Sequence, residues 1–242
     1  MKRQVTPWLL ATSFCLSATP ALASFNAGPN GLPEGWALFR INEKVAATQF
    51  KLLDAPEQGV LHAIAQNSMA GIIRKQRVDL AKTPLLCWQW KIKSSVAKAD
   101  LSTKAGDDYA ARLYVLYDVP AIQLALSDRV KIKLAKSLYG AEIPTAALNY
   151  VWDNKHAIGT MRANAYTDRT RLIVLQSGNS KAGQWQREIR DVRQDYLAAF
   201  GSPAPDVVGL AIATDTDNTQ SKAEAWYQEP RFVANAEQCP SK

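Results

Sequence analysis

The chain has 242 residues and a net charge of +7, from 29 basic and 22 acidic side chains. The basic residues are scattered along the sequence, and no single block of them marks a nucleic-acid-binding tail, so we expect no nucleic acid as a partner. No linker, low-complexity tract or internal repeat divides the chain, and its length fits one all-β domain.

The first 23 residues are expected to be a signal peptide. Lys2 and Arg3 precede an apolar stretch over 8–16, and Ala21-Leu22-Ala23 supplies the small residues that a signal peptidase reads. The stretch is shorter than the about 20 residues that cross a bilayer, and no second one follows, so we expect no transmembrane segment. The mature protein, a single domain over 24–242, would then begin at Ser24 in the periplasm or outside the cell, with a net charge of +5.

Alternation of apolar and polar residues predicts β-strands along nearly the whole mature chain. The expected strands are 36–41, 60–65, 72–78, 86–92, 109–117, 148–153, 171–177, 185–192, 207–214 and 223–233. In the fourth strand one face is apolar, and the other is expected to be polar, with Cys87 and Lys91 among its residues. Pro230 removes a hydrogen-bond donor from the last strand and predicts an edge or a bulge there.

Two short helices interrupt the strands. Ser127 caps a predicted helix over 127–138, with Gly140 as its stop, and a second predicted helix over 192–200 ends before Gly201. Many strands with few helices predict an all-β fold, an antiparallel two-sheet sandwich of jelly-roll type. A parallel α/β fold is disfavoured, because its crossovers would need more helices.

Cys87 and Cys239 are the sole cysteines of the mature chain, since Cys15 lies in the signal peptide. In an exported protein we expect them to form the only disulfide. Two free thiols are the alternative, because sequence spacing alone cannot show that two cysteines meet in space.

A set of motifs occurs in a characteristic order along the chain. They are Gly106-Asp107-Asp108-Tyr109-Ala110-Ala111-Arg112-Leu113-Tyr114-Val115, Leu148-Asn149-Tyr150-Val151-Trp152, Trp185 with Glu188, Arg190-Asp191-Val192, Asp195-Tyr196, Phe200-Gly201 and Thr214-Asp215-Thr216-Asp217-Asn218-Thr219. Together they resemble the secreted bacterial family known as domain of unknown function 3047. The resemblance implies one domain and brings no known activity or catalytic residue.

More loosely, the layout resembles jelly-roll carbohydrate-binding modules and galactose-binding domains. These often close with an aromatic strand that bears an acidic residue able to ligate structural calcium. The matching segment here has Glu229 where that family has Asp, and Pro230 where it has an aliphatic residue. A metal role for Glu229 is therefore not carried over, and a shared fold does not by itself carry function.

Asp215, Asp217 and Asn218 follow an apolar strand and offer hard oxygen ligands. We expect them to bind a cation or a sugar, with Asp215 and Asp217 as ligands of calcium. An Asx-type turn is the structural alternative. If the strand continued, the two carboxylates would lie on one face, roughly 6 to 7 Å apart, as in a glycosidase. An EF-hand is excluded, because Gln220 and Trp226 occupy the positions of its Gly and Glu.

Arg112, Tyr114, Asn149 and Trp152 are the other candidate ligand-binding residues. Arg112 and Tyr114 lie on the polar side of an otherwise apolar strand and need partners. Arg112 either binds a ligand or pairs with a carboxylate across the sandwich, with the candidates Asp153, Glu188 and Asp191. Trp152, like Trp185, either stacks on a sugar ring or packs in the core.

The motifs of common enzymes are absent from the sequence. The mature chain has only two histidines, His62 and His156, and it has no Gly-x-Ser-x-Gly elbow, phosphate-binding loop or dinucleotide fingerprint. We therefore expect an exported binding protein whose ligand is a glycan or envelope polysaccharide, anionic because the mature chain is basic. The alternatives are a carboxylate-dependent polysaccharide hydrolase or lyase, and an envelope interaction protein without a small ligand.

Overall fold

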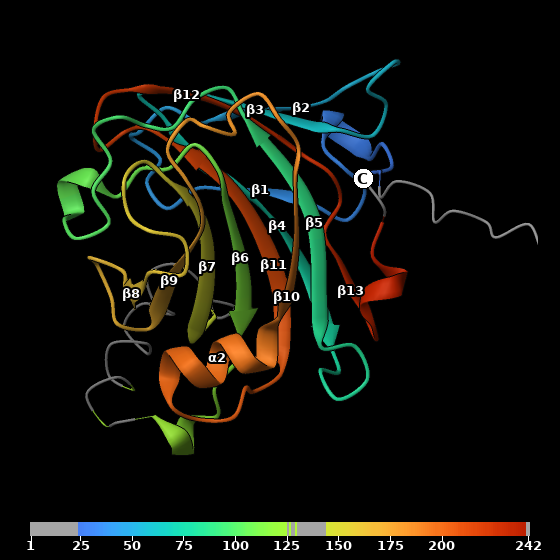
Figure 1. Cartoon of the computed structure of the whole chain (residues 1–242), viewed down its shortest axis with the longest axis vertical. Coiled ribbons are helices and arrows are strands. Elements are labelled where there is room, and N and C mark those ends of the chain that lie inside the picture. The colour runs from blue at the N-terminus through green and yellow to red at the C-terminus, as the bar shows by residue number, and fades with distance from the viewer. Residues whose placement is uncertain (1–23, 125, 127–128, 130–143, 241–242) are drawn as a thin grey trace, which may run out of the picture.

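The computed structural model describes residues 24–124, 126, 129 and 144–240. These residues form a two-layer β-sandwich with one α-helix, α2, at an end of the strands (Figure 1). The predicted signal peptide lies outside the described residues, and so does almost all of the predicted helix over 127–138. None of the described helices is long and apolar enough to cross a membrane.

The two layers differ in size. The seven-stranded sheet has the order β1 (Ala37–Phe39), β4 (Met69–Val78), β11 (Val207–Asp215), β6 (Arg112–Tyr117), β7 (Ala146–Asp153), β9 (Thr170–Ser177) and β8 (Met161–Ala163). The six-stranded sheet has the order β10 (Gln186–Asp191), β5 (Leu85–Ile92), β12 (Lys222–Tyr227), β3 (Leu61–Gln66) and β2 (Gln49–Leu52), and β13 (Arg231–Val233) also pairs with β5. The strand pairs are antiparallel except β7 with β9, which run parallel. The predicted sandwich is confirmed.

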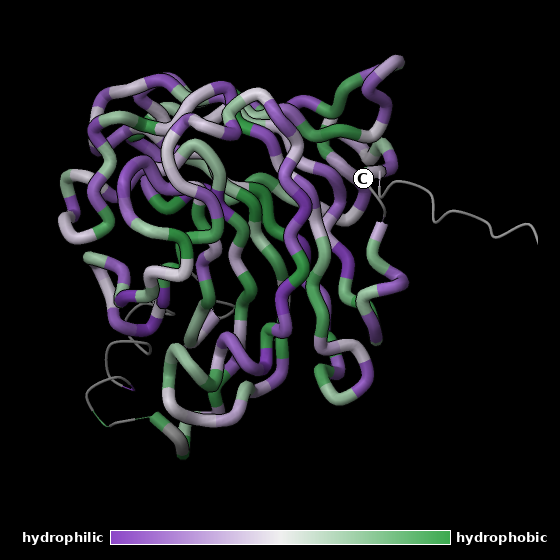
Figure 2. The backbone as a smooth tube through the Cα atoms, in the orientation of Figure 1, coloured by the Kyte–Doolittle hydropathy of each residue, from purple (hydrophilic) through white to green (hydrophobic). Residues whose placement is uncertain are grey.

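Aromatic side chains from both sheets fill the space between the layers. Trp88 and Trp90 of β5 face inward as predicted, and their ring centroids lie 5.3 Å from Tyr150 and 6.2 Å from Trp152 of β7, respectively. Such pairs contribute roughly 0.5 to 1.5 kcal/mol beyond the burial of their area. Figure 2 shows apolar residues along the central strands and polar residues in most of the connecting loops.

Several predicted strands are shorter in the structure. The strand expected over 36–41 is reduced to β1, and the strand expected over 185–192 is reduced to β10. The strand expected over 109–117 begins only at Arg112, because the backbone N–H of Tyr109 binds the side chain of Asp215, 3.0 Å away, instead of a neighbouring strand. The strand expected over 223–233 is divided into β12 and β13 around Pro230, which cannot donate to a ladder. The strands β2, of four residues, and β8, of three, had no period-two signal long enough to be predicted.

Helix α2 (Val192–Phe200) has the predicted boundaries. The carboxylate of Asp191 accepts hydrogen bonds from the backbone N–H groups of Arg193 and Gln194, and Gly201 closes the helix with φ 70°. Tyr196 packs against Tyr117 of β6, with ring centroids 4.7 Å apart. The helix therefore caps the sandwich at one end of the seven-stranded sheet.

The disulfide between Cys87 and Cys239 is present, and its Cα atoms lie 5.7 Å apart. Cys87 lies on the outer face of β5 with Lys91, as alternation predicts, but this end of the face is apolar instead of polar, since Cys87 is 1% exposed and packs with Val233 and Ile189. The C-terminal segment covers this part of β5 and makes it a small apolar cluster. A disulfide at this position is typical of a protein that folds in an oxidising compartment.

Replacing both Cys87 and Cys239 by alanine is expected to lower the free energy of unfolding. The bridge spans 152 residues, and the chain-entropy model assigns a loop of that length up to about 5 kcal/mol. Urea unfolding of the oxidised wild type and the double variant measures the difference. Equal unfolding midpoints, or two free thiols in the purified exported protein, would contradict the assignment.

Candidate functional site

The predicted ligand-binding residues separate into three places. Arg112, Tyr114 and Asp215 lie with Asn149 on the outer face of the seven-stranded sheet, where β11, β6 and β7 are neighbours. Trp152 points to the inner face of β7, and the pair Asp217 and Asn218 lies in the turn after β11. The structure therefore brings four of the seven residues together.

Arg112 is the centre of a buried ion cluster. Its guanidinium donates to Asp215 and to Asp107, and it lies 4.3 Å from the ring centroid of Tyr109. Asp107 also accepts a hydrogen bond of 3.0 Å from the side chain of Asn164. Arg112 is only 4% exposed, so the cluster already uses the charge that a ligand would need.

The partners expected for Arg112 across the sandwich, which were Asp153, Glu188 and Asp191, are wrong. Arg112 begins β6 opposite Ala213 of β11, and the two strands are antiparallel. The end of β11 therefore brings Asp215 to Arg112, and the loop before β6 brings Asp107. Both partners come from the same side of the seven-stranded sheet.

Asp215 is a carboxylate with an unusual environment. Burial raises the pKa of Asp215 to about 7, and the nearby carboxylates of Asp107 and Asp108 add to this, while Arg112 opposes it. One guanidinium thus forms ion pairs with two carboxylates in a buried environment. Oδ1 of Asp215 accepts from the backbone of Tyr109, and Oδ2 accepts from Arg112.

Asp217 does not continue the strand, because β11 ends at Asp215. The common strand face assumed for a carboxylate pair therefore does not form. Asp108 accepts hydrogen bonds from the backbone of Asn218 and Thr219, at 3.3 and 2.6 Å, and so holds the turn. Among the described residues, no group of three or more His, Cys, Asp or Glu is arranged to hold a metal ion. Calcium binding at Asp215 and Asp217 stays a prediction.

Asn218 fixes the turn to neighbouring loops. Its side-chain amide donates to the backbone oxygen of Lys104 and to the hydroxyl of Tyr166, both at 2.9 Å. The ammonium of Lys104 in turn lies 5.2 Å from the ring centroid of Tyr166. These contacts give Asn218 a structural role in the described fold.

Tyr114 and Asn149 lie opposite each other on β6 and β7. Burial raises the pKa of Tyr114. Asn149 is fully buried beside it, and neither its amide nitrogen nor its oxygen makes a well-formed hydrogen bond. Trp152 is 1% exposed, packs on Trp90 and donates to the backbone oxygen of Gly178 at 3.0 Å. The prediction that the Trp152 ring stacks on a ligand is therefore wrong.

The outer face of the six-stranded sheet carries a row of residues of which the sequence indicated only Trp185 as a candidate for binding. Lys91 of β5 lies opposite Trp226 of β12, which lies opposite His62 of β3, which lies opposite Lys51 of β2. The rings of His62 and Trp226 are stacked, 4.7 Å apart and within 4° of parallel. We call these four residues, together with Trp185, the aromatic row.

Lys91 joins the two indoles of the aromatic row. Its ammonium lies 4.7 Å from the ring centroid of Trp226 and 5.1 Å from that of Trp185. Both indoles are partly exposed. Alternation predicts that Lys91 lies on the outer face. No local pattern predicts that Trp226, His62 and Lys51, from three other strands, lie in line with it.

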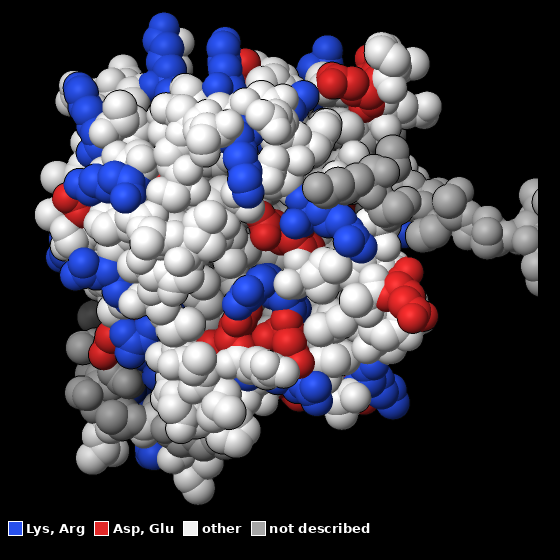
Figure 3. Space-filling model, viewed as in Figure 1, with Lys and Arg blue, Asp and Glu red and all other residues white. Residues whose placement is uncertain are grey.

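A second polar group closes one edge of the sandwich. Glu188 of β10 accepts hydrogen bonds from Trp90 at 3.1 Å and from Gln176 of β9 at 2.7 Å, so it links the two sheets. Burial raises the pKa of Glu188. Beside it, Asp195 binds Arg190 and the hydroxyl of Tyr150. Figure 3 shows acidic atoms gathered where β10 enters α2, with basic atoms next to them.

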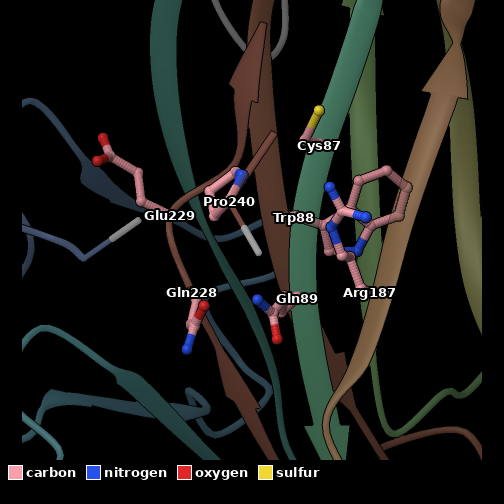
Figure 4. A pocket seen from close by; sticks show the side chains of 7 residues that line it. All are labelled: Cys87, Trp88, Gln89, Arg187, Gln228, Glu229 and Pro240. Carbon is pink, nitrogen blue, oxygen red and sulfur yellow. The ribbon is translucent and has the colours of Figure 1, made fainter. Parts of the chain in front are cut away.

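A small hollow lies next to the disulfide (Figure 4). Its lining residues are Cys87, Trp88, Gln89, Arg187, Gln228, Glu229 and Pro240. Its volume of about 10 Å³ is room for about one water molecule. It is too small for a sugar ring.

Comparisons with known proteins give one family and a few distant structures. A family described as "Protein of unknown function (DUF3047)" matches residues 34–231. A search of curated proteins finds no match. The chain is similar to the xyloglucanase domain of NopAA, a type three effector from Sinorhizobium fredii in complex with cellobiose, with TM-score 0.43 and 6% identity over 90% of this chain and 100% of that one.

A family 12 xyloglucanase from Bacillus licheniformis in complex with ligand is also similar, with TM-score 0.39 and 9% identity over 83% of this chain and 99% of that one. Likenesses this distant carry no argument about activity.

Replacing Arg112 by methionine is expected to destabilise the fold by about 3 to 5 kcal/mol, because two buried carboxylates lose their cation. Urea unfolding at pH 8, above the pKa of Asp215, measures the loss. Arg77→Met is the matched control, since Arg77 forms only an exposed pair with Asp206 at 3.7 Å, and it should cost under about 1 kcal/mol. Similar losses in both variants would contradict a buried ion cluster.

The raised pKa of Asp215 predicts a pH dependence of stability. Between the ordinary value of 3.8 and the folded value of about 7, the folded state keeps a proton that the unfolded state has released. The free energy of unfolding should therefore fall as the pH rises from about 4 to about 7. Asp215→Asn should remove this contribution, whereas the exposed Asp206→Asn should not. A wild type that gains stability relative to Asp215→Asn over this range would refute the prediction.

Proposed function

The chain belongs to the family of proteins of unknown function DUF3047, and from its geometry we propose that it is an exported protein that binds a polysaccharide of the cell envelope without cleaving it. The signal-peptide pattern and the disulfide support export to the periplasm or the exterior. The aromatic row on the six-stranded sheet is the observation that carries the proposal.

The shape of the aromatic row suits a sugar polymer. Sheet residues that lie opposite one another on neighbouring strands are about 5 Å apart, so the row extends across the strands as a line of side chains. The stacked rings of His62 and Trp226 and the nearby indole of Trp185 remain partly exposed and together form an apolar strip. Pyranose rings have apolar faces that pack on aromatic side chains, and exposed aromatic groups often mark binding sites.

The charges of the row favour an anionic polymer. Lys51 lies at one end of the row, Lys91 lies between Trp226 and Trp185, and the exposed Lys93 follows directly after β5. The excess of basic over acidic residues in the whole chain acts in the same direction. By contrast, Arg112 on the other sheet is neutralised by two carboxylates and is not available to the polymer.

The carboxylates beside the row support binding over hydrolysis. Glu224 is held by Lys93 at 2.6 Å, and this bond lowers the pKa of Glu224 and keeps it ionised. Glu57 is half exposed and lies 3.8 Å from Lys91. Retaining and inverting glycosidases need one carboxyl group that keeps its proton as an acid. The lowered pKa of Glu224 is the opposite of what that role needs, and Glu57 is half exposed rather than buried.

Trp226→Ala is expected to weaken binding to an envelope polysaccharide by about tenfold or more, since the loss of one stacking ring corresponds to roughly 1.4 kcal/mol. Affinity electrophoresis in gels that contain the polymer measures the change. Tyr166→Ala is the matched control, because Tyr166 is also an exposed aromatic residue but contacts Lys104 and Asn218 instead of the row.

Equal binding by wild type and Trp226→Ala would show that the row is not the site. Release of reducing ends or unsaturated sugars from the polymer would place the protein among the hydrolases or lyases. Binding of a periplasmic protein with no polymer binding would favour an envelope interaction protein.

A further inference from the structure

Lys91 holds an unusual position in the aromatic row. Its ammonium is placed between the ring faces of Trp226 and Trp185, and its side chain is only 17% exposed. Cation–π contacts of this kind fix where an ammonium lies but leave its N–H groups free to donate. The fold therefore holds a positive charge between two aromatic rings.

The donors of this ammonium are not used within the protein. No hydrogen bond joins Nζ of Lys91 to another residue in the part of the chain that the structure describes. The closest carboxylate oxygen belongs to Glu57 and lies 3.8 Å away, beyond the usual 2.7 to 3.2 Å of a hydrogen bond. The neighbouring Lys93, in contrast, is bound to Glu224 at 2.6 Å. The ammonium of Lys91 thus keeps its hydrogen-bond donors for an anion.

We propose that Lys91 recognises the carboxylate of a uronic acid that lies across the exposed edges of Trp226 and Trp185, so that the ligand of the aromatic row is a polyuronate. This inference rests on the proposed function. The ammonium of Lys91 lies over the ring faces of both indoles, and His62 also stacks on Trp226, so the exposed ring edges are the part left for a sugar. A uronic acid carries its carboxylate directly on the ring, so a sugar on those edges brings the carboxylate to the ammonium between them.

The repeat of a polyuronate fits the two lysines of the row. Both indoles are within reach of the ammonium of Lys91, so the sugars that lie against their edges would be near neighbours in one polymer. Lys51 lies beyond His62 at the far end of the row and is exposed. A polymer with one carboxylate on each ring presents an anion at both positions, whereas a polymer with rare anionic groups does not.

The chemistry of the site favours carboxylate over phosphate. Bidentate binding of phosphate needs the guanidinium of arginine or several backbone N–H groups, whereas lysine acts as a single point charge. The cation between the indoles is a single lysine, and Arg187 on the same sheet is directed to the backbone oxygen of Cys239 at 3.3 Å. A single ammonium suits the single charge of a carboxylate.

Polygalacturonate and its fully methyl-esterified form test the inference, because they share ring faces and hydroxyl groups and differ in the carboxylate charge. The wild type should bind the acid form at least tenfold more tightly at low salt, and this preference should shrink as salt screens the charge. Lys91→Met should abolish the preference and leave the affinity for the ester unchanged. Lys98→Met, which removes an exposed lysine away from the row, should keep the preference.

Lys91→Arg and a thermal melt complete the test. The arginine variant should keep most of the preference, since it keeps the charge, and unchanged melting temperatures would show that both Lys91 variants are folded. Equal binding of acid and ester, or equal effects of Lys91→Met and Lys98→Met, would overturn the inference. So would tighter binding of a phosphate-bearing glycan than of polygalacturonate.

The two proposals fail in different ways. If both polymers bind equally and Trp226→Ala weakens both, the aromatic row is a glycan site and only the role of Lys91 is wrong. If neither polygalacturonate, nor its ester, nor a set of neutral envelope glycans binds, both proposals are wrong.

Discussion

The packing of Trp88 and Trp90 against Tyr150 and Trp152 between the sheets is the constraint on which the other features depend. Side chains alternate strictly along a strand, so burying these rings decides which residues face outward. A slip of one residue in β5 would bury Lys91 and expose both indoles, at a large cost in free energy. The position of the outer faces is therefore fixed by the core.

The two outer faces use charge in opposite ways. On the seven-stranded sheet, Arg112 is buried with Asp107 and Asp215 and forms an ion pair with each of them. These ion pairs oppose the desolvation cost of burying the three charged groups. On the six-stranded sheet, the ammonium of Lys91 is held by aromatic rings and lacks a hydrogen-bond acceptor among the described residues. The first arrangement stabilises a fold, and the second is suited to a ligand.

The edges of the sandwich are closed by polar contacts and by the disulfide. Glu188 joins β10 to β9 through Gln176, and Cys239 ties the C-terminal segment to β5. These bonds keep β5 in place between its neighbours. Since β5 carries both the inward tryptophans and the outward Lys91, the rigidity of the edges also sets the geometry of the aromatic row.

Local patterns in the sequence were enough for the strand faces of β5 and for the bounds of α2 with its end at Gly201, and a count of cysteines left a single possible disulfide in the mature chain. Those features depend on alternation, on backbone capping or on a count, which neighbouring residues determine. The partners of Arg112 and the meeting of His62, Lys91 and Trp226 were decided by the order of strands in each sheet. The strand order brings together residues that are far apart in the chain. It is determined by the burial of whole sheet faces, so no local sequence pattern predicts which residues become neighbours.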